Sequence, residues 1–220
     1  MPRPRPSRRL AAPLTGALLA LLAGGSAVVH VQSERDLHRR VLVPAHDAPA
    51  AATFAPTPAA HAALVERGAR VVAERGCAGC HGADLGGQVL ADDALMGRLA
   101  TPNLTAGGRG AALTDRAWEL ALRHGVQGDG TPLRVMPSGE YAAMGDEEVA
   151  AVAAYARSLP AVATRPPALR VGPLARLLHV AGRFDLTPAH AIARRQAESA
   201  GAGGGGAAHV ALAPAGASRR

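Results

Sequence analysis

The sequence is poor in aromatic residues and contains no lysine. Phe, Tyr and Trp together make up 2% of its 220 residues, so a domain of modest size lacks the large side chains that usually fill a core. A buried prosthetic group would supply the missing apolar surface. Strand-like runs and internal repeats are also absent, so the sequence predicts neither a sheet-based fold nor a repeat array.

The net charge of +7 is spread unevenly along the sequence. Residues 1–60 carry +4 and residues 161–220 carry +6, whereas residues 61–160 carry −3. The basic excess therefore belongs to the two ends of the chain, and the central segment is mildly acidic. No basic stripe is interleaved with aromatic residues, so nucleic-acid binding is not expected.

The N-terminal 31 residues combine a basic start, residues 1–9, with an almost uncharged run at residues 10–31. A helix of about 22 residues is about 33 Å long, enough to cross a hydrocarbon core of about 30 Å. Two interpretations stay open: a transmembrane anchor with residues 1–9 in the cytoplasm, or a signal peptide cleaved near Ala27. The apolar run continues through Val31, which favours the anchor. Both interpretations export the rest of the chain.

Five consecutive residues, Cys77-Ala78-Gly79-Cys80-His81, form a C-x-x-C-H motif. This pattern is typical of the covalent attachment of a c-type haem, in which the two thiols add to the vinyl groups and the histidine reaches the iron. The chain has no other cysteine and no second motif, so one haem is predicted. Bacterial haem attachment of this kind takes place outside the cytoplasmic membrane, in agreement with the predicted export.

Two other uses of a C-x-x-C motif fit the sequence less well. A thioredoxin-like redox site should lie beside a βαβ pattern, and no such pattern is visible. A zinc site needs further ligands, such as two histidines three to five residues apart. His124, the nearest downstream histidine, has no such mate. Haem attachment is therefore the favoured interpretation.

A haem iron bound by His81 needs a sixth ligand, which is usually Met or His. Apart from the initiator, the methionines are Met96, Met136 and Met144. Met96 follows His81 by only 15 residues, and Met144 directly precedes the last predicted helix. Met136 is predicted to lie in an extended loop and is followed by a proline that stiffens the backbone. Spacing alone ranks Met136 first and leaves the other two open.

The rest of the sequence divides into three segments. An Ala- and Pro-rich linker is predicted at residues 32–60, the haem domain at 61–160, and a basic, partly disordered tail at 161–220. Apolar periodicity predicts helices that end at residue 76, span 114–124 and span 146–159, and a short amphipathic segment at 171–180.

These features together resemble a class I c-type cytochrome. More narrowly, they are similar to the monohaem modules of membrane-associated cytochromes that serve bacterial dehydrogenases and respiratory chains. The resemblance covers about residues 61–160. It rests on the order of C-x-x-C-H at 77–81, T-P-N-L-T at 101–105, R-H-G at 123–125, M-P at 136–137 and G-D-E-E at 145–148.

The resemblance implies an all-α cytochrome c fold, with three to four helices wrapped around one covalent haem c. The first and last of these helices are expected to cross near Gly68 and Tyr155. The implied site residues are Cys77 and Cys80 as thioether links, His81 and Met136 as the two axial iron ligands, and Pro102 as a possible acceptor for the His81 ring N–H.

An iron with both axial positions filled has no open site for a substrate, so the predicted function is electron transfer and not catalysis. The expected partners are redox proteins, such as a dehydrogenase, an oxidase or another cytochrome, and the membrane itself. The expected location is the bacterial inner membrane, with the haem domain facing the periplasm or the cell exterior. The alternative is a haem-based enzyme or gas sensor with an open or labile sixth ligand.

Overall fold

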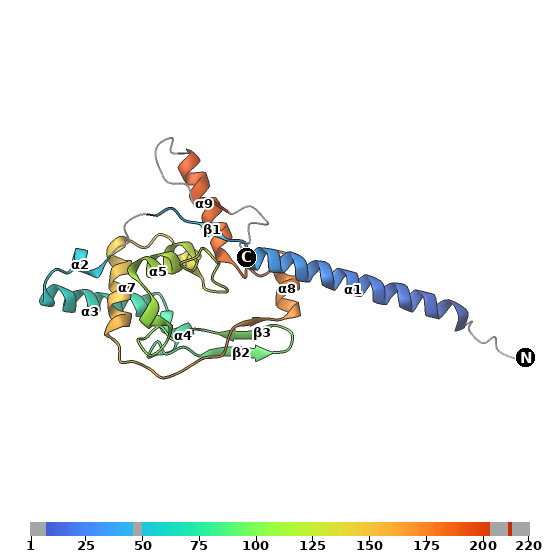
Figure 1. The fold of residues 1–220 in the computed structure, drawn as a ribbon, viewed down its shortest axis with the longest axis horizontal. Helices are drawn as coiled ribbons and strands as arrows, with labels where there is room; N and C mark the ends of the chain where they lie inside the picture. The colour runs from blue at the N-terminus through green and yellow to red at the C-terminus, as the bar shows by residue number, and fades with distance from the viewer. Residues whose placement is uncertain (1–7, 46–49, 203–210, 213–220) are drawn as a thin grey trace, which may run out of the picture.

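The computed structural model describes residues 8–45, 50–202 and 211–212, and is mostly helical (Figure 1). Its helices are α1 (Arg8–His38), α2 (Ala51–Phe54), α3 (Pro58–Glu74), α4 (Cys77–His81), η1 (Arg109–Ala112), α5 (Asp115–Glu119), η2 (Leu120–His124), α6 (Ser138–Tyr141), α7 (Asp146–Ser158), α8 (Pro173–Val180) and α9 (Pro188–Ala202). Its strands are β1 (Val41–Leu42), β2 (Val89–Asp93), β3 (Gly97–Ala100), β4 (Arg170–Val171) and β5 (Ala211–Leu212).

Helices α3 and α7 cross at Gly68, and this crossing organises the domain. A Cβ atom at Gly68 would lie 2.1 Å from the Ala151 carbonyl oxygen and 2.7 Å from the Tyr155 Cβ. Only a glycine lets the two backbones approach this closely. The crossing that the family resemblance implied near Gly68 and Tyr155 is therefore confirmed.

The ends of these helices follow from local chemistry. The Thr57 side chain accepts the Ala60 N–H and caps α3, whose first residue is a proline. Glu148 accepts the Gly145 N–H at 3.0 Å, and three acidic residues occupy the first turn of α7, where the helix dipole favours them. Thr114 caps α5, which continues into η2 and ends at Gly125 in the left-handed conformation.

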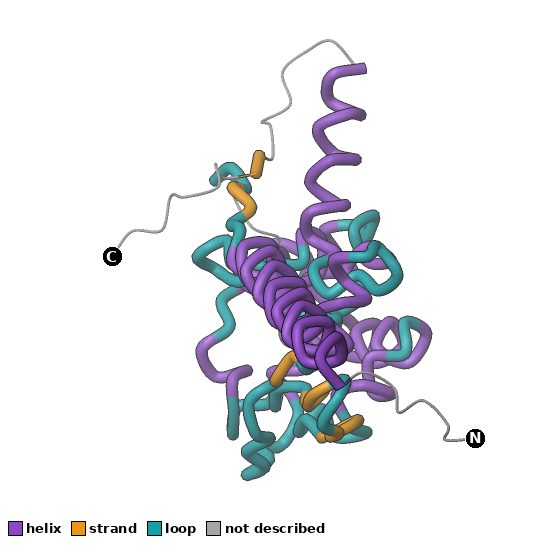
Figure 2. Tube along the Cα trace, turned by 90° about the vertical axis from the view of Figure 1, so that its right-hand side faces the viewer, coloured by secondary structure: helices purple, strands orange, loops and turns teal. Residues whose placement is uncertain are grey.

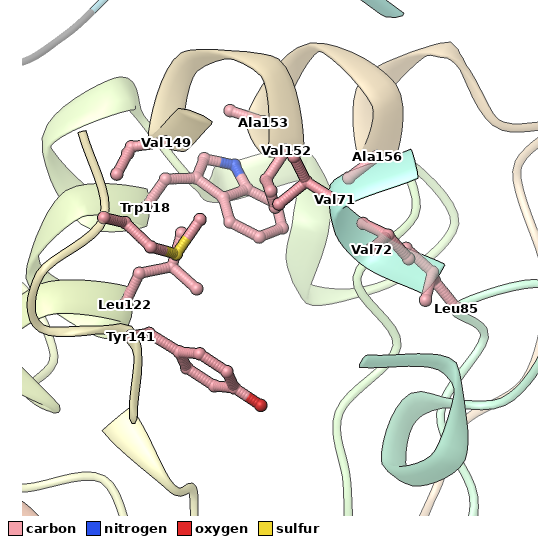
Figure 3. Packing of buried hydrophobic residues seen from close by; sticks show 11 residues of the cluster. Val71, Val72, Leu85, Trp118, Leu122, Tyr141, Val149, Val152, Ala153 and Ala156 are labelled. Carbon is pink, nitrogen blue, oxygen red and sulfur yellow. The ribbon is translucent and has the colours of Figure 1, made fainter. Parts of the chain in front are cut away.

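The main core lies between α3, α5, η2 and α7 (Figure 3). Its buried members are Val71, Val72, Leu85, Trp118, Leu122, Tyr141, Met144, Val149, Val152, Ala153 and Ala156. Most of these side chains are small, as the low aromatic content of the sequence requires. Six of them also line a cavity that residues of α4 share: Val72, Leu85, Trp118, Leu122, Tyr141 and Val152.

A small sheet, which the sequence analysis did not predict, covers one flank of the domain. Strands β2 and β3 form an antiparallel hairpin, and β4 pairs with the outer edge of β3. Seen from the α1 end, these strands lie below α1 (Figure 2). The domain is thus mostly helical but not purely α.

The segment predicted as a plain linker, residues 32–60, contains several ordered elements. Helix α1 continues to His38, seven residues beyond the expected end of the anchor at Val31. Strand β1 follows directly, and Val41 is fully buried. Helix α2 and the start of α3 occupy residues 51–60. Past Val31 the helix is built into the domain, since Ser33 and Leu37 are buried and Arg176 of α8 donates to the Ser33 hydroxyl.

The segment predicted as a partly disordered tail also folds over much of its length. The expected amphipathic segment is α8. Helix α9 buries Ala189, Ile192 and Ala193, and the first and third of these pack against Val41 and Leu120. Strand β5 pairs with β1. The low-complexity residues 203–210 and 213–220 lie outside the described residues.

Candidate functional site

The C-x-x-C-H motif forms the short helix α4, directly after α3. Gly76, in the left-handed conformation, separates the two helices, and Gly82, at a φ of 84°, ends α4. In a helix, residues three and four apart share a face, so Cys77, Cys80 and His81 all project from one side of α4. All three line the same cavity.

The imidazole of His81 is fixed by a backbone carbonyl. Its Nδ1 lies 3.0 Å from the Pro102 carbonyl oxygen, which can only accept, so Nδ1–H donates. Burial lowers the pKa of His81 below 6.5, and the bond to Pro102 opposes this shift. The favoured form is the neutral tautomer with an unprotonated Nε2, which is the atom that binds a metal.

Two polar side chains secure the C-terminal end of α4. The Thr101 hydroxyl donates to the Cys80 carbonyl at 2.7 Å, and the Gln88 amide donates to the carbonyls of Gly79 and Cys80 at 3.0 and 3.1 Å. These bonds satisfy carbonyls that the end of a helix leaves without a partner. Gln88 directly precedes β2 and Thr101 directly follows β3, so these bonds also join α4 to the β2–β3 hairpin.

Asn103, the residue after Pro102, is buried and uses its whole amide. Its Nδ2 donates to the Val162 and Thr164 carbonyls at 2.7 and 3.1 Å, and its Oδ1 accepts from the Thr105 N–H and hydroxyl at 2.9 and 2.7 Å. The loop that holds Pro102 against His81 is thereby tied to the chain beyond α7. Sequence reasoning quoted Asn103 within the T-P-N-L-T motif but gave it no role.

Met136 lines the same cavity from the loop between η2 and α6. The preceding residue, Val135, has a φ of 66°, which is uncommon for a β-branched residue, and its N–H donates to the Leu186 carbonyl at 3.1 Å. Two residues after Met136, the Ser138 hydroxyl donates to the Ala121 carbonyl at 2.9 Å. Bonds on both sides therefore hold this loop. No sequence pattern pointed to Leu186.

The cavity between α4 and the Met136 loop has an empty volume of about 1310 Å³, including the part open to solvent. Its walls are mainly apolar and come from α3, α5, η2, α7, β2 and β3. The residues important for its chemistry are Cys77, Cys80, His81, Pro102, Arg109, Trp118, Arg134, Met136 and Tyr141. Two thiols, a histidine and a thioether that line one cavity are the donors that a covalently attached haem requires, so the residues fit this group.

The charged residues near the cavity divide into two sets. Arg109 and Arg134 line it and could face the carboxylates of a bound cofactor, and the Arg109 guanidinium donates to Gln127 at 2.6 Å. Arg123 is instead bonded to the Met144 carbonyl, Asp146 and the buried Glu119. Arg123 does not line the cavity.

The other sequence candidates lie elsewhere. Met144 is buried in the main core, and Met96 lies in the turn of the β2–β3 hairpin. His124 is buried, and its Nδ1 lies 3.2 Å from the Gln196 amide oxygen. Within the described residues, no group of three or more His, Cys, Asp and Glu side chains could hold a metal ion.

Residues 65–160 match the family model described as Cytochrome c. The match extends from α3 to the residues just after α7 and includes α4, the Pro102 loop and the Met136 loop. No curated protein and no solved structure matches the chain significantly.

Proposed function

Residues 65–160 form a cytochrome c domain, a domain of haem-based electron transfer, and from this premise we propose that the protein is an electron carrier with one haem c whose iron is bound by His81 and Met136. The observation that carries the proposal is that Cys77, Cys80, His81 and Met136 line one cavity. Once attached, a haem c supplies an iron that changes charge by one electron.

The residues of the chain have separate tasks in this proposal. Cys77 and Cys80 attach the cofactor through two thioether bonds. His81 presents Nε2 to the iron because the Pro102 carbonyl holds Nδ1–H. Met136 would be the second iron ligand and would raise the reduction potential relative to a second histidine. The apolar walls would exclude water, and Arg109 and Arg134 would offset the negative charge of the cofactor's carboxylates.

The proposed route leads from a membrane or periplasmic dehydrogenase to the respiratory chain. The haem domain carries a charge of −3, which suits a partner with a basic docking surface. Helix α1 contains one stretch, Thr15–His38, long and apolar enough to cross a membrane or to act as a signal sequence. We favour the membrane anchor because exposed apolar side chains continue to Val31, beyond the candidate cleavage site near Ala27. The haem domain would then face the periplasm or the cell exterior.

Replacing Met136 tests the axial ligand. In Met136→Ala, we expect the oxidised protein to lose the long-wavelength absorption band of His/Met ligation and to bind carbon monoxide readily when reduced. In Met136→His, the iron stays six-coordinate and the reduction potential falls, within the roughly 0.8 V range that axial ligands span. Absorption spectra and redox titration measure both effects.

Met144→Leu is the matched control, because Met144 is buried in the core and does not line the cavity. This variant should keep the wild-type band and potential. A wild-type protein that lacks the band and binds carbon monoxide would instead support the haem enzyme or gas sensor.

A further inference from the structure

The last turns of α1 are built into the domain. Ser33 and Leu37 are fully buried. Arg176 of α8 bonds to Glu34 at 2.6 Å and donates to the Ser33 hydroxyl at 2.9 Å. The apolar run of α1 ends at Val31, and at 1.5 Å per residue Glu34 lies only about 4.5 Å further along the helix axis. Helix α8 therefore packs beside α1 directly where its apolar part ends.

The β2–β3 hairpin is attached to the same place. The Leu174 N–H donates to the Leu95 carbonyl at 3.0 Å, and the Gly172 N–H donates to the Met96 carbonyl at 2.9 Å. The turn of the hairpin is thus fixed to the N-terminal end of α8. In Figure 1, this turn and α8 both lie on the side of the domain from which α1 extends.

Outside α1, the exposed large apolar residues in the described part of the chain are Leu42, Phe54, Val89, Leu90, Leu95, Met96 and Leu177, and five of these seven belong to the hairpin or to α8. Leu95, Met96 and Leu177 lie in the hairpin turn and in α8, on the side of the domain from which α1 extends. The exposed fraction is 59% for Leu95, 37% for Met96 and 50% for Leu177. Single exposed apolar residues are common, but a group collected beside an apolar helix indicates a contact surface.

The charges beside these side chains are largely compensated. Asp93 accepts the N–H groups of Leu95 and Met96 and thereby shapes the turn. Asp92 pairs with Arg98 at 2.8 Å and with Arg170 at 3.4 Å. Arg35 is exposed on α1 close to the end of the apolar run. The balance of positive and negative side-chain charge at this place therefore does not repel anionic lipid headgroups.

We propose that Leu95, Met96 and Leu177 form a membrane face that inserts into the interfacial layer of the bilayer in which α1 is anchored. The proposal rests on the anchor role of α1 given above. A lipid surface fits because the three side chains belong to α8 and to the hairpin turn bonded to it, and α8 packs against α1 where its apolar part ends, which is where the headgroup layer would begin. Apolar side chains at this depth are stabilised at the boundary between headgroups and acyl chains. The membrane face would hold the haem domain in one orientation on the membrane.

Site-directed spin labelling tests this contact in the full-length haem protein reconstituted into phosphatidylcholine/phosphatidylglycerol vesicles. Because haem attachment consumes Cys77 and Cys80, a cysteine introduced at Leu95 or Leu177 is the only free thiol. Nitroxides there should collide several-fold less often with a water-soluble nickel chelate, and more often with oxygen, than a nitroxide at Phe54. Phe54 is a matched control, because it is an exposed apolar residue on α2, at the end of the domain away from α1 (Figure 1).

A nitroxide at Leu22 separates this proposal from the anchor. If the Leu22 label is in lipid while the Leu95 and Leu177 labels are as accessible to nickel as Phe54, the membrane face is wrong and the anchor stands. If the Leu22 label is in water, the anchor itself is wrong. Labels at Leu95 and Leu177 that are shielded from both nickel and oxygen indicate a protein contact and also overturn the proposal.

A second measurement needs no substitution. Wild-type protein in vesicles that contain a photoactivatable phospholipid should form lipid adducts on peptides from α1, the hairpin turn and α8, and none on α2 peptides. Adducts confined to α1 would contradict the membrane face.

Discussion

Asn103 shows how a single buried side chain positions the proposed proximal ligand. Its amide makes four hydrogen bonds, two to carbonyls beyond α7 and two to Thr105. Pro102, the acceptor for His81, is the preceding residue. The orientation of the imidazole therefore depends on a contact between segments about 60 residues apart in the sequence.

We predict that Asn103→Ala lowers the free energy of unfolding of the haem protein by about 1–3 kcal/mol, because it leaves buried donors and acceptors without partners. Chemical denaturation measures this loss. Ser158→Ala is the matched control, since the Ser158 hydroxyl makes one exposed bond to the Tyr155 carbonyl and its loss should cost less than about 0.5 kcal/mol. Equal losses of unfolding free energy in the two variants would show that the hydrogen bonds of Asn103 stabilise the protein no more than one exposed hydroxyl does.

At the scale of residues, sequence reasoning could identify what a short motif specifies. The C-x-x-C-H pattern and the Met-Pro pair singled out Cys77, Cys80, His81 and Met136, and these four roles stay predictions until a ligand is measured. The supporting bonds from Gln88, Asn103 and Leu186 could not be predicted. They join segments far apart in the chain, and their geometry exists only once the fold brings these segments together.

At the scale of elements, the backbones of α3 and α7 pack so closely at Gly68 that no side-chain atom fits between them. Gly68→Ala should destabilise the protein by about 1–3 kcal/mol, because the new Cβ would overlap the Ala151 carbonyl. This is the net loss that remains after the gain of about 1 kcal/mol in helix propensity is subtracted. Thermal or chemical denaturation measures the difference.

Gly25→Ala is the control, because Gly25 is also helical and nothing lies within 4 Å of its added Cβ. It should leave stability unchanged or slightly raised. A Gly68→Ala variant as stable as Gly25→Ala would mean that the two helices can separate at no cost.

Helices α3, α5, η2 and α7 were predictable because they have local signals: an apolar stripe, a threonine cap or an acidic first turn. The β2–β3 hairpin was missed because its strands, VLADD and GRLA, lack both alternation and β-branched residues after Val89. Contacts with β4 and α8 stabilise it instead. Helix α9 was missed for a related reason, since its composition resembles the low-complexity end and only burial against Val41 distinguishes it.

At the scale of the whole molecule, acid should loosen the contact between α9 and the rest of the protein. Two histidines lie in this contact: His124, bonded to Gln196, and His190, which lies 2.9 Å from the Arg39 carbonyl. Burial lowers the pKa of both below 6.5, despite the nearby carboxylates Glu119, Asp36 and Asp185. The unfolded state then takes up protons first as the pH falls.

The stabilisation by these neutral histidines is complete above about pH 6.5 and is lost as the pH decreases toward their lowered pKa values. We therefore expect the denaturation midpoint to decrease as the pH is lowered from 7.5 to 5.5. Hydrogen exchange in α9 should become faster over the same pH range. A His124→Asn/His190→Asn double variant should show a flatter pH dependence. A wild-type midpoint that rises on acidification would contradict the assigned direction.

The docking of α1 on α8 has a consequence for how a redox partner finds this protein. A haem domain on a long flexible chain would sample a hemisphere of positions and could meet a partner at many heights. Here α1 joins the domain without a free connecting segment, since Leu37 and Val41 are both buried. With α1 anchored in a bilayer as proposed, the search for a partner would become a two-dimensional one, with lateral diffusion and rotation about a single axis. A partner able to exchange electrons must hold its own redox centre at one fixed height above the lipid.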